Sequence, residues 1–577
     1  MRAIRVVFGI VFVLGMWICV PTARTWYVNP DGTGDAPTIQ DAFDLGVSGD
    51  TILLANGTFR GDGNRDIDHH GKSVVLRSEA QDPRKCIIDC EGSEADPRRG
   101  FYFHFDEGPG AILEGVTIKN AYAPLESRWV AEHTRGGKIH FEEWIMSVPT
   151  GWQEKRREEE DRRWSQRSHE AARQMIAQRG DSKSKKPPKI TLRPWRSGGA
   201  IIYESLSENQ VTLTIKNCVF EENYAYFGAA IGASGDLTIS DCLFRSNSGA
   251  AVSASSGETT IADCRFSNNE RGGQVSSAGI SVYYCDLTVR KCMFSDNQGT
   301  ALECCGFYGT MALDRCTFAR NNGHGVRVDV RSAILEKCIF LDNSSCGVWS
   351  ELVFDLVMVG CEFRNNKSYG VVLDESSAEI RDCMFQGHGL SGLFAFGCLD
   401  AFDCVFSKNI TKYGAVNLGS WVRATFHGCE FTDNTGELGG GGLGIKTSSW
   451  AGGRNVELQD CIFANNSASK GGAIYCSSEY AGAPDWLRLS NCTFRANNAD
   501  RGGAVFLNGL GVDSCIVADF ANCTFYGNSA THGGGIFVEG SAFATLKTTI
   551  IGFSNEGEAV YCSGLDTPPP QLLCSDI

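Results

Sequence analysis

The chain has 577 residues, of which 68 are acidic and 53 are basic, so its formal net charge is −15. This balance argues against general binding of nucleic acids or anionic membranes. The 67 glycines and only 15 prolines fit a regular fold with many turns.

The first 23 residues have the layout of a secretory signal peptide. Arg2 and Arg5 precede an apolar run from Val6 to Val20, and Pro21-Thr-Ala23 follows it. The run is short for a membrane-spanning helix, and the sequence offers no second candidate. We therefore expect export, no membrane span in the mature chain, and a location outside the cell or on its surface.

Residues 24–121 are predicted to form an N-terminal cap and the first coils of a repetitive fold. The segment Ile112-Leu-Glu-Gly-Val-Thr-Ile-Lys-Asn120 reads as a variant repeat. A polar cluster near the cap is a candidate site: Asp66, Asp68, His69 and His70.

Residues 122–197 interrupt that repeat as an insertion at a turn. They hold no cysteine, five of the eleven tryptophans, and 17 Lys and Arg against 11 Asp and Glu, so the insertion is basic. Gln153 to Arg179 reads as a charged helix whose apolar contacts are Trp164, Ala171, Ala172, Met175 and Ile176. Two interpretations stay open: a helical excursion packed on the fold, or a docking module for an acidic partner.

Between Cys218 and Asn528 the phrase Cys-x-Phe-x-x-Asn recurs thirteen times at spacings of 21 to 32 residues. Only one copy departs from it, with His388 in the place of the Asn. Such a period is typical of solenoids. Apolar residues alternate within each repeat, and a slip of phase at Lys216-Asn217 indicates a bend. Each repeat therefore predicts three short strands joined by turns.

Stacked repeats would pair their backbones and bury one continuous core. We predict an all-β fold, a parallel β-helix solenoid of about fifteen coils whose regular repeats occupy residues 198–562, with a helical or irregular insertion. At ~4.8 Å per coil the rod would be on the order of 70 Å long. The recurring Asn should form an internal ladder, and Gly370 or Gly503 should allow a positive φ at a bend. Residues 563–577 hardly supply a cap, which predicts a truncated product or a stack continued by a partner.

Thirteen of the 25 cysteines occupy one inward position of the repeat. We expect a buried column of mostly free thiols, because bridges between stacked neighbours are geometrically awkward. Cys86 and Cys90 would lie about 13 Å apart on one strand and should not pair. No Cys-x-x-Cys pair or Cys/His cluster has the ligand spacing of zinc, so we expect no metal and no cofactor.

With these repeats the chain resembles the right-handed parallel β-helix superfamily, which includes pectate lyases and polygalacturonases. The pairing of Phe463-Ala-Asn-Asn466 with Gly471-Gly-Ala-Ile474 resembles the passenger repeats of polymorphic outer-membrane proteins, and the likeness covers about Gly198 to Tyr561. The segment from Trp26 to Leu53 is similar to the cap of secreted bacterial β-helix proteins. The resemblance implies a right-handed solenoid but supplies no catalytic motif.

Functional residues must lie on outward positions and in turns, because inward positions hold the core. One outward set follows the third strand and is aromatic: Trp349, Phe394, Tyr475, Phe506, Phe537 and Tyr561. If open, these rings would form a long shallow groove on which sugar rings stack. In the alternative, loops 477–485 and 508–513 fold over them.

A second outward set lies where the first strand ends in three consecutive coils: Arg290, Lys291, Asp314, Arg315, Glu336 and Lys337. Asp314 and Glu336 would be one coil apart, close enough for repulsion to perturb a pKa. In the β-helix superfamily that the chain resembles, lyases of acidic polysaccharides use carboxylates and Arg or Lys on the outside of the rod. In the alternative interpretation, the alternating acidic and basic side chains on stacked strands form ion pairs that stabilise the rod and have no catalytic role.

The leading hypothesis is an exported or cell-surface, adhesin-like protein that binds polysaccharide or another surface and has no catalytic motif. The alternative is a polysaccharide lyase or glycoside hydrolase that acts on acidic glycans through Asp314 and Glu336. The third hypothesis is a purely structural spacer that neither binds a ligand nor catalyses a reaction.

Overall fold

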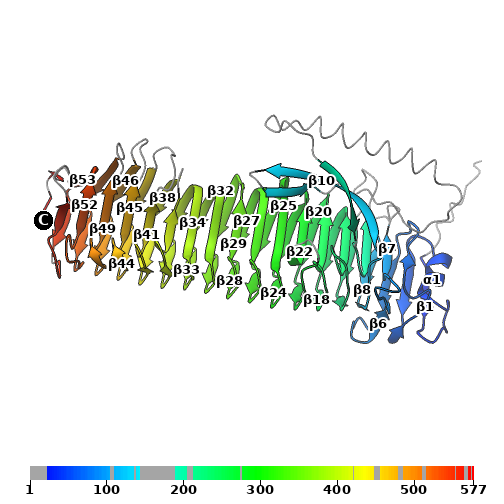
Figure 1. The fold of residues 1–577 in the computed structure, drawn as a ribbon. Helices are drawn as coiled ribbons and strands as arrows, with labels where there is room; N and C mark the ends of the chain where they lie inside the picture. Colours follow the sequence, from blue (N-terminus) through cyan, green and yellow to red (C-terminus); the bar gives the residue numbers. More distant parts are fainter. Residues whose placement is uncertain are drawn as a thin grey trace, which may run out of the picture.

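The computed structural model is a long rod of stacked coils (Figure 1). It describes residues 23–103, 110–135, 138–142, 189–195, 197–204, 212–272, 276–419, 422–446, 455–478, 485–509, 515–552, 554–563, 570–573 and 575–576. In all, 57% of the structure is strand and 2% is helix, so the all-β prediction is confirmed.

Each coil has three strands separated by bends, as the alternation of apolar residues predicts. One coil consists of a first strand β14 (Thr212–Lys216), a second strand β15 (Val219–Glu221) and a third strand β16 (Ile231–Ser234). First and third strands share one 32-stranded sheet, and the second strands of the described residues form another, of seventeen strands. Pairing is parallel and in register. The parallel β-helix is therefore confirmed, with more coils than the fifteen expected.

In the middle coils the bend between the third and first strands is so shallow that the two merge into one long strand. The merged strands are β25 (Thr300–Asp314), β27 (Val326–Glu336), β32 (Tyr369–Arg381) and β34 (Ser391–Phe402). The coil between β27 and β32 keeps its two strands apart as β29 (Val348–Glu351) and β30 (Asp355–Val359).

The remaining strands of the rod repeat this scheme toward both ends. First strands are β1 (Thr25–Val28), β2 (Thr51–Leu54), β5 (Val75–Ser78), β8 (Ile112–Glu114), β17 (Asp236–Ser240), β20 (Glu258–Ala262), β23 (Asp286–Arg290), β38 (Arg423–His427), β42 (Asn455–Gln459), β46 (Asp485–Ser490), β50 (Ile516–Ala521), β53 (Ala542–Lys547) and β56 (Gln571–Leu573). Second strands are β3 (Gly57–Phe59), β6 (Cys86–Asp89), β9 (Thr117–Lys119), β18 (Leu243–Arg245), β21 (Arg265–Ser267), β24 (Met293–Ser295), β26 (Thr317–Ala319), β28 (Ile339–Leu341), β31 (Glu362–Arg364), β33 (Met384–Gln386), β35 (Val405–Ser407), β39 (Glu430–Thr432), β43 (Ile462–Ala464), β47 (Thr493–Arg495), β51 (Thr524–Tyr526) and β54 (Ile550–Gly552). Third strands are β4 (Ile67–Asp68), β7 (Phe101–Phe103), β13 (Ile201–Glu204), β19 (Val252–Ser255), β22 (Ser277–Tyr283), β37 (Val416–Leu418), β41 (Leu443–Lys446), β45 (Ile474–Ser478), β49 (Val505–Gly509), β52 (Ile536–Gly540) and β55 (Val560–Ser563).

The bends are made by single residues in the left-handed conformation. Asn217 has a φ of 47° just before the repeat cysteine, which explains the slip of phase, and Glu222 has a φ of 57° just before the ladder Asn. The expected positive φ at the third strand falls on Gly502 (63°) rather than on Gly503, and Gly370 has none. Gly370 is required for a different reason, because a Cβ there would lie 2.4 Å from the backbone oxygen of Gly392.

Two columns of repeat residues fill the core along the axis. Twelve contacts between successive second-strand phenylalanines, from Phe220 to Phe525, are stacked with ring centroids 4.4 to 5.0 Å apart. Beside them the Asn ladder is confirmed. Asn247, for example, donates from Nδ2 to the Oδ1 of Asn269 (2.9 Å) and to the backbone oxygen of Phe220 (3.0 Å).

His388 interrupts the ladder. Its Nε2 lies 3.1 Å from the backbone oxygen of Phe363, whereas its Nδ1 is buried without a hydrogen-bond partner. Burial lowers the pKa of this imidazole to about 4, so the side chain is neutral in the folded rod.

The thirteen repeat cysteines are buried free thiols, as expected. The backbone N–H of Cys218 donates to the Sγ of Cys242 (3.4 Å), and the Sγ of Cys264 donates to the backbone oxygen of Ala262 (3.0 Å). The column therefore packs as small side chains that also take part in hydrogen bonds across coils. Cys86 and Cys90 are likewise free.

At the N-terminal end a short helix, α1 (Ile39–Leu45), covers the first coils (Figure 1). The Oγ1 of Thr38 accepts the backbone N–H of Asp41 (3.1 Å) and so caps the helix. Ile39, Ala42 and Phe43 of the helix are buried in the core.

The described parts of the insertion are strands, not the helical or irregular structure that we expected. They form a separate antiparallel sheet of β10 (Glu126–Arg135), β11 (Lys138–Glu142) and β12 (Lys189–Trp195). The helix predicted over 153–179, with its five apolar contacts, lies outside the described residues, as do residues 1–22 of the predicted signal peptide. Among the helices of the described chain, none is long and apolar enough to cross a membrane.

Candidate functional site

One row of outward side chains runs along the third strands, and the strand register fixes its members. We call it the outward column: Glu303, Arg327, Trp349, Val372, Phe394, Asn417, Gly444, Tyr475, Phe506, Phe537 and Tyr561. All six predicted aromatic residues belong to it. Their environments differ greatly between the middle and the C-terminal coils.

The aromatic rings of the C-terminal coils are buried. Tyr475, Phe506 and Phe537 form a small apolar cluster outside the main core, and Tyr561 packs on it half-buried. Phe506 has no exposed surface and stacks on Phe537 at 5.0 Å between ring centroids. The open groove that we considered for these coils is therefore wrong, because the rings are buried, and their cover by the two loops stays a prediction.

The described chain shows what covers these rings. A small outer sheet of β36 (Ile410–Thr411), β40 (Thr435–Gly436), β44 (Ser467–Lys470) and β48 (Asn498–Arg501) is present only at this end of the described rod. From this sheet the Lys470 ammonium lies 5.2 Å from the Phe506 ring centroid, and the Arg501 guanidinium lies 5.8 Å from that of Phe537. The loops expected to cover the rings lie largely outside the described residues.

In the middle coils the outward column begins with a charged triplet, which we define as Glu303, Arg327 and Glu351. The Arg327 Nη1 lies 3.1 Å from the Oε1 of Glu303, and its Nη2 lies 3.4 Å from the Oε2 of Glu351. The Ser276 hydroxyl donates to the other oxygen of Glu303 (2.6 Å). Glu303 is only 5% exposed, so this carboxylate is buried and already satisfied.

The triplet holds its guanidinium charged. Burial alone would lower the pKa of Arg327, but the two flanking carboxylates outweigh burial and raise it. Burial and the nearby Arg327 charge lower the pKa of His324 to about 4, so this imidazole is neutral. His324 also packs edge-on against Trp349, with ring centroids 5.5 Å apart.

In the coil of Trp349 and the next two coils, the surface opens into a cavity of about 410 Å³ at the bend between third and first strands. Three successive coils line it: Val353, Phe354, Glu375, Ser376, Ser377, Phe396, Gly397 and Cys398. Phe354 is 70% exposed, whereas Phe396 is half-buried. The cavity therefore offers two aromatic rings and one carboxylate to a ligand.

The floor of the cavity is a closed hydrogen-bond network. The Ser376 Oγ accepts the hydroxyl of Ser350 (2.7 Å) and the backbone N–H of Val353 (3.1 Å), and donates to the backbone oxygen of Asp374 (3.1 Å). A Cβ at Gly397 would lie 2.2 Å from the backbone oxygen of Ser376, so a larger residue cannot occupy that position without a shift of the chain. The network holds the walls of the cavity in place.

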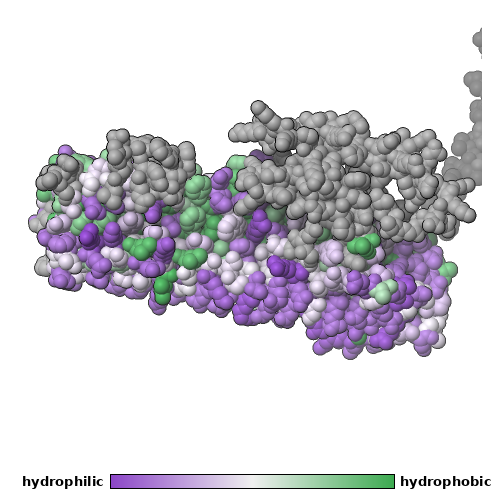
Figure 2. All heavy atoms as spheres, in the orientation of Figure 1, coloured by the Kyte–Doolittle hydropathy of each residue, from purple (hydrophilic) through white to green (hydrophobic). Residues whose placement is uncertain are grey.

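Exposed apolar side chains also occur at the turns between second and third strands, at the other end of the third strand from the cavity. Leu390, Ile410 and Leu438 lie there and are 42 to 71% exposed. Figure 2 shows hydrophobic residues, in green, on this part of the rod, where the hydrophilic covering is interrupted.

The second predicted set, at the ends of the first strands, lies on the surface as expected. The strand register places Arg290, Asp314 and Glu336 in one row. A hydrogen bond from the Arg315 side chain (2.6 Å) lowers the pKa of Asp314, the direction opposite to that expected from repulsion by Glu336. Lys291, Arg315 and Lys337 are left-handed corner residues, with φ of 51° each. These contacts are those of paired surface charges, and a catalytic role for this set stays a prediction.

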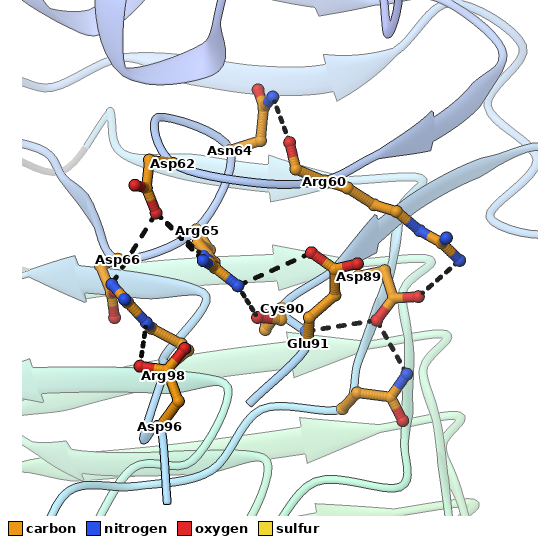
Figure 3. Close-up of polar contacts among 11 residues, drawn as sticks. Arg60, Asp62, Asn64, Arg65, Asp66, Asp89, Cys90, Glu91, Asp96 and Arg98 are labelled. Atoms are coloured by element: carbon orange, nitrogen blue, oxygen red, sulfur yellow. Dashed lines mark hydrogen bonds and ion pairs between the residues drawn. The ribbon is translucent and has the colours of Figure 1, made fainter. Parts of the chain in front are cut away.

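Of the predicted polar cluster near the cap, Asp66 belongs to a network of ion pairs (Figure 3). Arg98 contacts both Asp66 (3.2 Å) and Asp96 (2.9 Å), and Arg65 lies between Asp62 and Glu91. These pairs join successive coils and stabilise the N-terminal end.

The two histidines of that cluster are divided between surface and core. His70 lies on the surface between Asp44 (3.4 Å) and Asp68 (3.3 Å). His69 is buried between the rings of Phe43 and Phe103, and burial lowers its pKa to about 3. The structure therefore does not bring the predicted cluster together as one open site.

Sequence reasoning missed the triplet and the cavity. The outward column could have led to the triplet, because Glu303 and Arg327 occupy the same repeat position as Trp349. The cavity depends on turn residues such as Phe354 and Glu375, which the repeat leaves free to vary.

A family model described as "Right handed beta helix region" matches residues 201–352, 256–398 and 354–551, which together exceed half of the chain. The chain is similar in structure to the A-module of mannuronan C-5 epimerase AlgE4 of Azotobacter vinelandii, at 11% identity over 78% of this chain and 97% of that chain, with a TM-score of 0.36. It is also similar to the PL6 family alginate lyase AlyGC (9% identity, 96% and 100% coverage, TM-score 0.30) and to tailspike protein 3 of bacteriophage CBA120 (10%, 93% and 58%, 0.29). Likenesses this weak transfer no activity to this chain. No curated protein matches the sequence.

Proposed function

This chain belongs to the right-handed β-helix family, and we propose that it is an exported, non-enzymatic protein that binds a glycan at its middle coils. The observation that carries the proposal is the cavity of about 410 Å³ walled by Phe354 and Phe396. Aromatic faces with a few fixed polar groups suit stacking on the apolar face of a sugar ring.

The neighbouring side chains extend this surface along the rod. Trp349 and Phe394 are half-buried on the outward column of the coils that line the cavity, so part of each ring is exposed. Neighbouring coils lie ~4.8 Å apart, so rings on several coils would meet successive parts of one extended chain. A polymer rather than a single sugar is therefore the expected ligand.

Binding is favoured over catalysis by the state of the carboxylates. Glu303 is buried and bound by Ser276 and Arg327, and Asp314 is held ionised by Arg315. A general acid needs a pKa raised toward the working pH and contact with the substrate. The two carboxylates serve instead to hold their basic partners.

A glycan array probed with the full exported chain tests the proposal. We expect retention of a defined class of oligosaccharide, and about tenfold weaker retention by Phe354→Ala, the loss expected for a central aromatic contact. Phe402→Ala, at a half-buried ring on the first strand outside the cavity, is the matched control and should bind normally. A folded protein that retains no glycan, or a Phe354→Ala variant that binds as well as the parent, would contradict it.

A further inference from the structure

The charges around the cavity discriminate between classes of glycan. Among its eight lining residues Glu375 is the one charged side chain, and it is exposed. No ion pair to Glu375 occurs among the described residues. The ligand therefore meets a carboxylate beside two aromatic rings.

The nearest basic side chains lie at the two ends of the cavity and do not line it. On the C-terminal side, Arg423 lies one coil beyond Cys398 and pairs with it in register. On the N-terminal side, Arg331 lies next to Ser332, which pairs with Asp355 of the following coil. Arg327, the remaining cation of this face, is bound between Glu303 and Glu351. A ligand carboxylate at Arg327 would have to displace two carboxylates that are already in place.

Acidic side chains also adjoin the lining on its other sides. Asp355 follows Phe354 and Asp374 precedes Glu375 in the chain, whereas no basic residue directly flanks a lining residue in the chain. A polyuronate, with one negative charge per sugar, would be repelled from these carboxylates. The acidic glycans considered from the sequence are therefore the class that fits this cavity least.

A carboxylate beside an aromatic face is a favourable site for an ammonium group. The ammonium pairs with the carboxylate and is attracted to the negative face of the ring. Glu375 also holds a φ of 50°, a left-handed conformation that side chains other than Gly, Asn and Asp adopt at a cost. This conformation is the one that single bend residues adopt throughout the described rod, so it places Glu375 at the bend.

From this arrangement, which rests on the proposed glycan binding, we infer that the cavity selects a polymer of amino sugars, whose ammonium group lies between Glu375 and the rings of Phe354 and Phe396. The apolar face of the sugar stacks on the exposed ring of Phe354. The Glu375 carboxylate accepts the N–H groups of the ammonium.

Titration calorimetry with three hexasaccharides of matched length tests the inference: glucosamine, N-acetylglucosamine and galacturonate. We expect the glucosamine hexamer to bind about tenfold more tightly than the N-acetylated one, because acetylation removes the charge that both the ring and the carboxylate attract. The galacturonate hexamer should bind most weakly. Raising the salt concentration should weaken binding of the glucosamine hexamer but leave that of the N-acetylated one nearly unchanged.

Two substitutions separate a local contact from general attraction to an acidic protein. Glu375→Gln should lower affinity for the glucosamine hexamer about tenfold and leave the N-acetylated hexamer unaffected. Glu258→Gln, at an exposed carboxylate many coils away, removes the same charge and should change neither. Glu375→Asn is a second variant, since Asn tolerates the left-handed conformation and keeps the bend intact.

The outcomes distinguish the two proposals. Equal loss of affinity in Glu375→Gln and Glu258→Gln, or galacturonate binding as tight as that of glucosamine, would overturn the selection of amino sugars while leaving glycan binding in place. Absence of binding by all three hexamers and across the glycan array would remove the proposed function itself.

Discussion

The middle and the C-terminal coils place aromatic rings at the same repeat position and use them differently. Phe506 in β49 has no exposed surface, whereas Trp349 in β29 and Phe394 in β34 are half-buried and belong to coils whose bends line a cavity. The difference lies in the small outer sheet, which places Lys470 over Phe506. A position in the repeat therefore decides which way a side chain points, but not whether a ligand can reach it.

The largest expected effect is a loss of stability in the C-terminal coils, where the aromatic rings are buried. Phe506→Ala would leave a void between Tyr475 and Phe537, and a buried Phe→Ala change typically costs about 3–5 kcal/mol of unfolding free energy. Hydrogen exchange resolved by coil should show the loss in β45, β49 and β52, because solenoids unfold by neighbouring units. Glycan binding at the middle coils should be unchanged. Equal destabilisation by Phe394→Ala would contradict the distinction between the two halves.

Much of this comparison could be predicted from the sequence. The thirteen repeats predict the three-strand coil, the Asn ladder and the inward Cys and Phe, because those features depend on local alternation and on identical neighbours. The burial of Phe506 could be posed only as an alternative, because it depends on contacts from β44 and β48 outside the repeat phrase. The cavity was missed for the same reason: Phe354, Glu375 and Phe396 meet only after the coils are stacked.

The second expected effect concerns the charged triplet at the other end of the outward column. Arg327→Met would leave the buried Glu303 without its cation, and breaking a buried ion pair from one side costs about 3 kcal/mol or more. Thermal unfolding should show a clear fall in Tm. Arg315→Gln, which removes an exposed partner of Asp314, is the control and should leave the Tm within error. A fall of similar size in both variants would mean that burial does not distinguish the two pairs.

A third effect is stabilising and concerns the break in the ladder. His388→Asn would restore the hydrogen bonds that join the coils above and below, and we expect a gain of about 1 kcal/mol. The reverse change in the C-terminal half, Asn497→His, should destabilise, because it introduces the same break. Urea unfolding measures both, and a destabilised His388→Asn would show that the imidazole is preferred at that place.

The substitution His388→Asn should also change how the stability of the protein depends on pH. Because the pKa of His388 is lowered to about 4 in the fold and is near 6.5 in an unfolded chain, the unfolded state binds the proton between these values. Its contribution to stability is therefore complete above pH 6.5 and is lost as the pH falls toward 4. Stability curves of the parent and of His388→Asn should diverge in this window, and parallel curves would contradict the assignment.

The smallest expected effect on stability concerns the middle coils, where an aromatic ring is exposed at the cavity. Phe354→Ala removes a ring that is 70% exposed, so unfolding should change by less than about 0.5 kcal/mol. Its glycan affinity should nevertheless fall about tenfold. Matched chemical denaturation and binding curves check both at once. Together with Phe506→Ala, which should do the opposite, this variant separates rings that hold the rod from rings that meet a ligand.

The in-register ladder of Asn and Phe allows the number of coils to change during evolution. Each rung makes the same contacts upward and downward, as Asn247 does with Asn269 and Phe220. A whole coil can therefore be duplicated or deleted with every remaining rung still finding its usual neighbour. Duplication of a coil would lengthen the rod by ~4.8 Å and deletion would shorten it by the same step, so the cavity would move relative to either end without being rebuilt.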